Sequence, residues 1–377
     1  MLAAAVRSST PDIVFLFAGA GLVLYVASRA AVDALTPANE PAPGRLAVGH
    51  WIPIAWSALL ATAAGRAEIG ISIVFASSVA ALGMVLGVLT CISNNPDAGP
   101  RERSHAWPFV VPAAVLTLLA GFSGGLTWWH ALMLLGLGGC VLSVWLARKG
   151  DEPGGVAAMT TFTPAPAPMN PSGVTIFTSG NPIAAAPLPA ERTRGEWRWT
   201  RFLLAVALAG AGGWLAYRAT TVADDRTRIA TGGLIAAAVV SPLLALPMLG
   251  SGAIAAHHGR LSSAMAGIVG IVLLNLCLLL PLVILTSYTR QIVVDWDKLH
   301  PAAVAATTEP AEAVYQLRAV PFPLAVWRVD TVLLIVFGML LIPVSLGRLT
   351  LRKPEGLALA ILYAVYLVIS TALAIRL

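Results

Sequence analysis

Charged residues are scarce in this sequence: they make up 11% of the 377 residues, whereas hydrophobic residues make up 58%. Soluble proteins of this size carry roughly 25% charged residues. The composition therefore excludes an ordinary soluble protein and indicates an all-α, polytopic membrane protein. The net charge of +6 does not indicate a nucleic-acid partner. Lys and Arg lie at segment ends, where membrane orientation and contact with lipid head groups explain them.

Cysteines and catalytic motifs are also sparse. The three cysteines, Cys91, Cys140 and Cys277, lie far apart inside apolar segments. Their odd number and their spacing argue against a disulfide framework and a metal site, so we interpret them as small core residues. The sequence has no Gly-rich phosphate loop, no nucleophile elbow and no zinc-binding spacing. It therefore predicts neither an enzyme nor a bound cofactor.

Ten apolar runs are predicted to cross the membrane, since ~30 Å of hydrocarbon takes about 17–25 helical residues. They are residues 12–35, 46–64, 68–93, 107–122, 126–147, 201–217, 229–256, 261–286, 321–346 and 356–375. Residues 1–11 show no evident cleavage site, so we expect the first run to be a retained span rather than a signal peptide. The spans divide into five within residues 1–148 and five within 199–377.

Residues 149–198 separate the two halves and are rich in Pro, Ala, Gly and Thr. This segment lacks the apolar content for a core, so we expect a disordered linker. Lys and Arg are in excess on the side of the membrane that includes the linker, which predicts a cytoplasmic linker. With ten spans, both termini are then extracytoplasmic, in a multi-pass protein of the cell membrane.

A stretch of the first half recurs in the second half. Residues 53–66 and 247–260 share five positions at an offset of 194 residues. The pairs are Pro53 with Pro247, Ser57 with Ser251, Ala61 with Ala255, Gly65 with Gly259 and Arg66 with Arg260. The first four are spaced by four residues, so small side chains follow one helix face, where another backbone can approach closely. Because five spans is an odd number, the halves run in opposite directions and predict an inverted repeat, an architecture of secondary transporters.

Motif positions on the second and third segments of each half carry a family resemblance. In the first half they read Gly49-His50-Trp51-Ile52-Pro53-Ile54, Gly65-Arg66-Ala67-Glu68 and Ala76-Ser77-Ser78. In the second they read Leu243-Leu244-Ala245-Leu246-Pro247-Met248, then Ala255-Ala256-His257-His258-Gly259, then Ser263 to Asn275. Together with the run from Arg29 to Asp33, they resemble the cation/calcium exchanger superfamily, which includes the sodium–calcium exchangers. The resemblance implies ten transmembrane helices in two inverted five-helix repeats, with a cytoplasmic central loop.

The family's two ion-binding glutamates would fall at Ile54 and Met248. Calcium takes about six to eight oxygen ligands, and carboxylates supply the charge that offsets its dehydration. Beside Ile and Met, the charge of a divalent ion would stay unmatched in a site of low dielectric. The resemblance therefore implies transport ancestry without Ca²⁺ exchange by the family mechanism.

Other residues near the expected centre could hold a small neutral solute or a monovalent cation. These candidates are Ser57, Ser77, Ser251, Asn275, Pro53 and Pro247. The resemblance matches Ser77 and Asn275 to ligand positions on the third helix of each half, and each proline can free a backbone carbonyl. Each also has a structural alternative: serines can bond to their own helix one turn earlier, Asn275 can pair between helices, and the prolines can act as kinks alone.

Glu68 is a possible charged site, because ionisable residues in spans are functional candidates and the resemblance matches it to a family Asp. Its structural alternative is an ion pair with Arg66, two residues away. Asp330 has the same alternative with Arg328.

Histidines offer a further possibility. His50 stands in the first motif and could relay protons, although Trp51 beside it would fill space that an ion needs. His257 and His258 are adjacent, so on a helix they point in different directions, which argues against a metal site.

Two functions remain open at this stage. The first is a secondary transporter with an altered substrate, a monovalent cation or small solute. The alternative is a non-transporting membrane protein that keeps the bundle for a structural or partner-binding role, since fold does not fix function. An intramembrane enzyme lacks a candidate catalytic pair.

Overall fold

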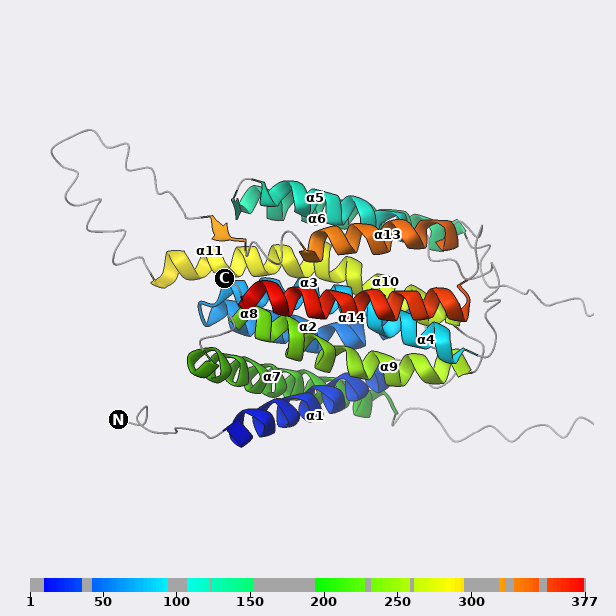
Figure 1. Cartoon of the computed structure of the whole chain (residues 1–377). Helices are drawn as coiled ribbons and strands as arrows, with labels where there is room; N and C mark the ends of the chain where they lie inside the picture. The colour runs from blue at the N-terminus through cyan, green and yellow to red at the C-terminus, as the bar shows by residue number, and fades with distance from the viewer. Residues whose placement is uncertain are drawn as a thin grey trace, which may run out of the picture.

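The described part of the chain is almost entirely helical, and its helices lie side by side along one direction (Figure 1). The computed structural model describes residues 10–35, 43–93, 107–122, 124–151, 194–227, 232–257, 261–294, 319–322, 329–345 and 351–375. Helices satisfy their own backbone hydrogen bonds, which an apolar chain in lipid requires because no water is available to do so.

Both halves combine long helices with short irregular turns. The first half contains α1 (Thr10–Leu35), α2 (Pro43–Ala63), α3 (Ala67–Ala80), the π-helical segment η1 (Ala81–Val85), α4 (Leu86–Ile92), the 3-10 turn η3 (Trp107–Phe109), α5 (Val110–Gly121), β1 (Gly125–Leu126) and α6 (Trp128–Asp151). The second half contains α7 (Arg194–Thr227), α8 (Gly232–Ile235), the π-helical segment η5 (Ala236–Val240), α9 (Ser241–His257), α10 (Leu261–Leu274), the π-helical segment η6 (Asn275–Leu279), α11 (Leu280–Val294), β2 (Val320–Pro321), α13 (Thr331–Ser345) and α14 (Lys353–Ile375).

Helix α3 lies at the centre of the bundle. All of its residues except Glu68 are buried, and it contacts α2, α9, α11 and α13. Helices α1 and α7 pack along one side, whereas α5, α6 and α13 lie on the opposite side (Figure 1). Outer helices expose apolar side chains, such as Phe15 and Val368. An outer apolar surface of this kind is suited to contact with lipid tails.

The ten predicted apolar runs each overlap an apolar helix. Within the described residues, seven helices are long and apolar enough to cross a membrane. They are Asp12–Leu35, Leu46–Ala63, Ala67–Ile92, Trp199–Asp225, Gly232–His257, Ser263–Val293 and Lys353–Ala372. Three shorter apolar helices are Val110–Gly121, Trp128–Ser143 and Thr331–Val344. The helices are those of a multi-pass membrane protein.

The predicted start of the ninth run at residue 321 is wrong. Residues Val320–Pro321 form strand β2, which pairs antiparallel with β1, and α13 begins ten residues later at Thr331. Proline lacks a backbone donor and favours an extended residue before it, so Pro321 suits this short strand better than a helix. Phe322 then packs against Phe75 of α3, with ring centroids 5.6 Å apart.

The predicted linker lies mostly outside the described residues, which leave out 152–193. Helix α6 runs to Asp151 and α7 begins at Arg194, so helix extends a few residues into each end of the predicted 149–198 segment.

The turn between α2 and α3 explains the glycine of the repeated stretch. Gly65 has φ of +92°, a left-handed conformation that glycine adopts without a steric penalty. Its N–H donates to the carbonyl of Thr62, and the N–H of Arg66 donates to the carbonyl of Ala61. These two bonds form a Schellman motif, which ends α2.

Element boundaries follow the same 194-residue offset as the sequence repeat. Helices α2 and α9 end at Ala63 and His257, and α3 and α10 begin at Ala67 and Leu261. The π-helical segments η1 and η6 span 81–85 and 275–279. The agreement extends the repeat from five matched residues to the ends and the local irregularities of two helices.

Two glycines allow α4 and α14 to touch. A Cβ on Gly87 would lie 2.8 Å from the carbonyl oxygen of Gly356, and a Cβ on Gly356 would lie 2.8 Å from that of Gly87. Both clashes involve backbone atoms, which cannot rotate away as side chains do.

Gly87→Ala is therefore expected to lower the melting temperature of the purified protein in detergent. Overpacking costs about 1–3 kcal/mol, more than the gain in helix propensity of roughly 1 kcal/mol. The matched control is Gly136→Ala in α6, where a Cβ would meet open space. Equal melting temperatures for the two variants would show that α4 and α14 are not in close contact.

Candidate functional site

The prolines and serines of the repeat lie inside helices α2 and α9. Pro53 and Pro247 are both within helix. The Oγ of Ser57 donates to the carbonyl of Pro53 at 2.8 Å, and the Oγ of Ser251 lies 3.2 Å from that of Pro247. Both serines thus make the bond to their own helix that was the structural alternative, and Ser251 makes a further contact.

His50 bridges three helices from both halves of the chain. Its Nδ1 lies 2.6 Å from the Oγ of Ser28 in α1, and its Nε2 lies 2.7 Å from the Oγ of Ser251 in α9. The side chain is buried, with 4% of its surface exposed. A buried histidine with partners at both ring nitrogens is held in one orientation.

The hydroxyl of Ser251 has contacts on two sides. Its Oγ lies 3.2 Å from the carbonyl of Pro247 and 3.3 Å from that of Met248, and it lies closer, at 2.7 Å, to Nε2 of His50. A hydroxyl can donate to a ring nitrogen or accept from it. These contacts link Ser28 through His50 to the backbone of α9.

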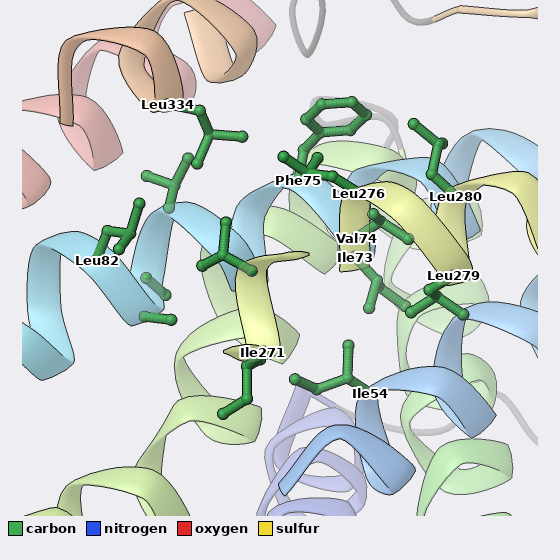
Figure 2. Packing of buried hydrophobic residues seen from close by; sticks show 14 of the residues in the cluster. Ile54, Ile73, Val74, Phe75, Leu82, Ile271, Leu276, Leu279, Leu280 and Leu334 are labelled. Atoms are coloured by element: carbon green, nitrogen blue, oxygen red, sulfur yellow. The ribbon is translucent and has the colours of Figure 1, made fainter. Parts of the chain in front are cut away.

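Hydrocarbon fills the positions that the family resemblance matches to glutamates. Ile54 is fully buried and Met248 is 3% exposed, and both belong to the main hydrophobic cluster. Figure 2 shows Ile54 pointing from α2 toward Ile73 and Leu279, with Ile271 of α10 nearby. Within the described chain, no group of three or more His, Cys, Asp or Glu side chains could hold a metal ion.

A small cavity lies beside this centre. Its volume is about 30 Å³, and its lining includes His50, Met248, Ser251 and Ile271. A cavity needs at least roughly 10–15 Å³ to hold a water molecule. The space is therefore of the size of one or two waters, and His50 and Ser251 supply polar groups to it.

Asn275 forms the second polar link between the halves. It is fully buried, and its Nδ2 donates to Ser77 at 3.1 Å and to Ser78 at 3.0 Å. Its Oδ1 is buried without a hydrogen-bond partner. At the 194-residue offset, the counterpart of Ser77 is Ile271 and that of Asn275 is Ala81. The contact therefore joins positions that are not equivalent in the repeat.

Glu68 lies in an ion-pair network at the end of α3. Its Oε1 lies 2.5 Å from the Nε of Arg66, which also pairs with Asp224 of α7. The hydrogen bond to Glu68, followed by that to Asp224, raises the pKa of Arg66 further above its ordinary value. Together, the two bonds outweigh partial burial, which by itself would lower the pKa of Arg66. The predicted pair with Arg66 is present, and Asp224 is an additional partner.

The remaining ionisable candidates lie elsewhere. Asp330 precedes α13 and is 3% exposed, and its Oδ2 has no hydrogen-bond partner. Arg328, its predicted partner, is outside the described residues. His257 ends α9, and His258 is likewise not described.

Three hydrogen-bond or ion-pair partners were not predicted from the sequence. Ser78 directly follows the candidate Ser77, so the doubled serine was an available signal. No sequence signal pointed to Ser28 or Asp224, since they lie 22 and 158 residues from the residues that they contact.

A family model matches part of the chain in sequence, and solved structures match the chain in fold. Residues 198–372 match the family model described as sodium/calcium exchanger protein. Among solved structures, the H+/Ca2+ exchanger CAX is 13% identical, with a TM-score of 0.58 over 96% of this chain and 83% of that chain. YfkE is 12% identical, with a TM-score of 0.59 over 96% and 91%. The sodium-calcium exchanger NCX_Mj is 16% identical, with a TM-score of 0.53 over 94% and 98%. No curated protein sequence matches the chain.

The apolar helices are those of a multi-pass membrane protein. The match to the sodium/calcium exchanger family model covers residues 198–372, just under half of the chain, and the whole chain shares its fold with the exchangers CAX and NCX_Mj.

We expect the double variant Ser77→Ala with Ser78→Ala to be less stable than the wild type. It leaves the buried amide of Asn275 without an acceptor, which costs about 1–3 kcal/mol. Ser57→Ala is the matched control, because that hydroxyl bonds within its own helix. Thermal unfolding in detergent measures the difference. If the double variant and the control have the same melting temperature, the amide of Asn275 does not hold the two halves together.

Proposed function

We propose that this protein is a secondary transporter of the exchanger fold whose centre does not bind Ca²⁺. The observation that carries the proposal is the burial of Ile54 and Met248 in the hydrophobic core, at the positions that the resemblance matches to the glutamates. An alkyl chain and a thioether supply neither charge nor a strong oxygen ligand to a divalent ion. The family-model match supports transport ancestry.

The substrate class under this proposal is a monovalent cation or a small neutral solute. Support comes from the neutral polar groups at the centre: the serine hydroxyls, His50 and the amide of Asn275. Ser57, Ser77, Ser251 and Asn275 remain the binding candidates, with the carbonyls near Pro53 and Pro247. Ser57 is the weakest of them, since its hydroxyl already bonds to its own helix.

A non-transporting role is the second candidate, and one observation favours it. The cavity beside Met248 has a volume of about 30 Å³, which is too small for a solute much larger than water. A bundle with a filled centre could serve a structural or partner-binding role.

The proposed architecture is ten transmembrane helices in two inverted five-helix repeats, residues 1–148 and 199–377, joined by the 149–198 linker. The shared offset of helix ends and of η1 and η6 supports the repeat. Three shorter apolar helices, added to seven longer ones within the described residues, support the count. The excess of Lys and Arg in short loops supports a cell-membrane protein with a cytoplasmic linker and extracytoplasmic termini.

The proposal for the centre predicts that the purified protein takes up no Ca²⁺ in liposomes and melts at the same temperature with Ca²⁺ or chelator. Binding at a hundred times Kd would stabilise by about 2.7 kcal/mol, which a thermal shift resolves. Robust Ca²⁺ transport by the unmutated chain would refute the proposed loss of the site.

Ile54→Glu combined with Met248→Glu should recreate two buried acids. Desolvation and mutual repulsion disfavour their ionisation without a cation. We therefore expect the double variant to be unstable in chelator and to gain stability with divalent cation. Ile54→Gln with Met248→Gln is the control of similar size and polarity without charge. Equal responses of the Glu and Gln variants to divalent cation would count against glutamate positions at 54 and 248.

Topology reporters test the inverted repeat. A reporter within residues 155–190 should be cytoplasmic, as should one in the 258–260 loop. A reporter at the equivalent loop, residues 64–66, should be extracytoplasmic, because five spans separate the two copies. Reporters at 64–66 and 258–260 on the same side would exclude an inverted repeat.

A further inference from the structure

A group of buried polar side chains lies away from the centre, between the start of α13 and helix α14. It consists of Asp330 and three residues of α14: Tyr363, Tyr366 and Ser370. All four residues are buried, with 2–8% of each exposed. The three α14 residues are spaced by three and four positions, so they share one face of that helix.

Four buried oxygens of this group have no hydrogen-bond partner. The Oδ2 of Asp330, both phenol oxygens and the Oγ of Ser370 are buried and unbonded. The hydroxyl of Tyr366 nevertheless lies close to both Asp330 and Ser370, and Tyr363 is also near the carboxyl. The four side chains thus come together around Tyr366.

The surrounding elements offer no compensating charge among the described residues. Helix α13 packs against α3, α5 and η3. Segments η3 and α5 contain no titratable residue, and Glu68, the single titratable residue of α3, is held by Arg66. Within the described part of the chain, the titratable groups that face Asp330 are the two phenols.

A buried carboxylate with an unbonded oxygen is costly in its charged form, because burial removes it from water and neutral partners do not balance its charge. A single positive charge removes that cost. Carboxylate, phenol and hydroxyl oxygens are hard ligands, suited to a hard cation. One carboxylate balances one charge, so a monovalent cation fits better than a divalent one.

We propose that Asp330, Tyr363, Tyr366 and Ser370 form a monovalent-cation site, in which Na⁺ and H⁺ compete for the carboxyl of Asp330. The site is formed by Asp330, directly before α13, and by α14. It includes neither Ile54 nor Met248, and it does not depend on the proposed function of the centre. The phenol and serine oxygens surround the Na⁺ ion. When a proton is bound instead, the carboxyl is neutral.

The experiment is thermal unfolding of the purified full chain in detergent, with NaCl replaced stepwise by N-methylglucamine chloride at constant ionic strength. At mildly alkaline pH, the melting temperature of the wild type should rise with Na⁺ and then saturate, since Na⁺ binds the folded state. At mildly acidic pH, a proton occupies the carboxyl and the effect of Na⁺ should shrink. In the absence of Na⁺, the melting temperature should fall as pH rises.

Asp330→Asn keeps the shape of the side chain and removes its charge, so its melting temperature should respond to neither Na⁺ nor this pH change. Asp225→Asn is the matched control on an exposed acid, and it should respond as the wild type does. Tyr366→Phe and Tyr363→Phe keep the rings and should shift the Na⁺ midpoint several-fold upward.

Two outcomes separate the ions. A response to Na⁺ that Asp330→Asn abolishes supports Na⁺ binding, and a response to pH alone that the same variant abolishes supports a proton site. A wild-type response that is retained in Asp330→Asn would overturn the proposal. If that variant does not fold, unchanged Na⁺ and pH responses in both Tyr→Phe variants would overturn it equally.

Discussion

The lack of water in the hydrocarbon region of a membrane is the constraint on which this structure depends. Each backbone and side-chain polar group there needs a hydrogen-bond partner supplied by the protein itself. Most of the described hydroxyls in the helices donate to a carbonyl of their own helix. Thr62, Thr90 and Thr117, for example, donate to the carbonyl one turn earlier. Asn275 and His50 have no such local bond, so their partners come from other helices.

These two residues hold the halves of the chain together in different ways. Asn275 donates two bonds across the core to Ser77 and Ser78 and leaves its own carbonyl oxygen unbonded. His50 is satisfied at both ring nitrogens and ties α2 to α1 and α9. Ile54 belongs to the hydrophobic core, where it points toward Ile73 and Leu279 (Figure 2). The protein thus combines the fold of the solved exchanger structures with an apolar core around Ile54 and Met248.

The repeat is more complete in the backbone than in the side chains. The offset of 194 residues is retained in the Schellman turn, in the helix ends and in the π-helical segments. These features depend on glycine, on small residues and on backbone geometry, and side chains that face the centre do not affect them. At the position equivalent to Asn275 the first half has Ala81, so the two halves do not carry matching polar groups there.

The sequence by itself determined the membrane class, the ten apolar runs, the repeat and its offset, and the ion pair of Glu68 with Arg66. Each of these depends on composition or on residues close together in the chain. The tertiary structure alone decided the partners of His50 and Asn275, the addition of Asp224 to the pair, and the approach of the α14 tyrosines to Asp330. It also moved the start of α13 from 321 to Thr331, because β2 pairs with a strand almost two hundred residues earlier. Contacts between distant segments depend on how helices pack, and no local pattern in this sequence records that packing.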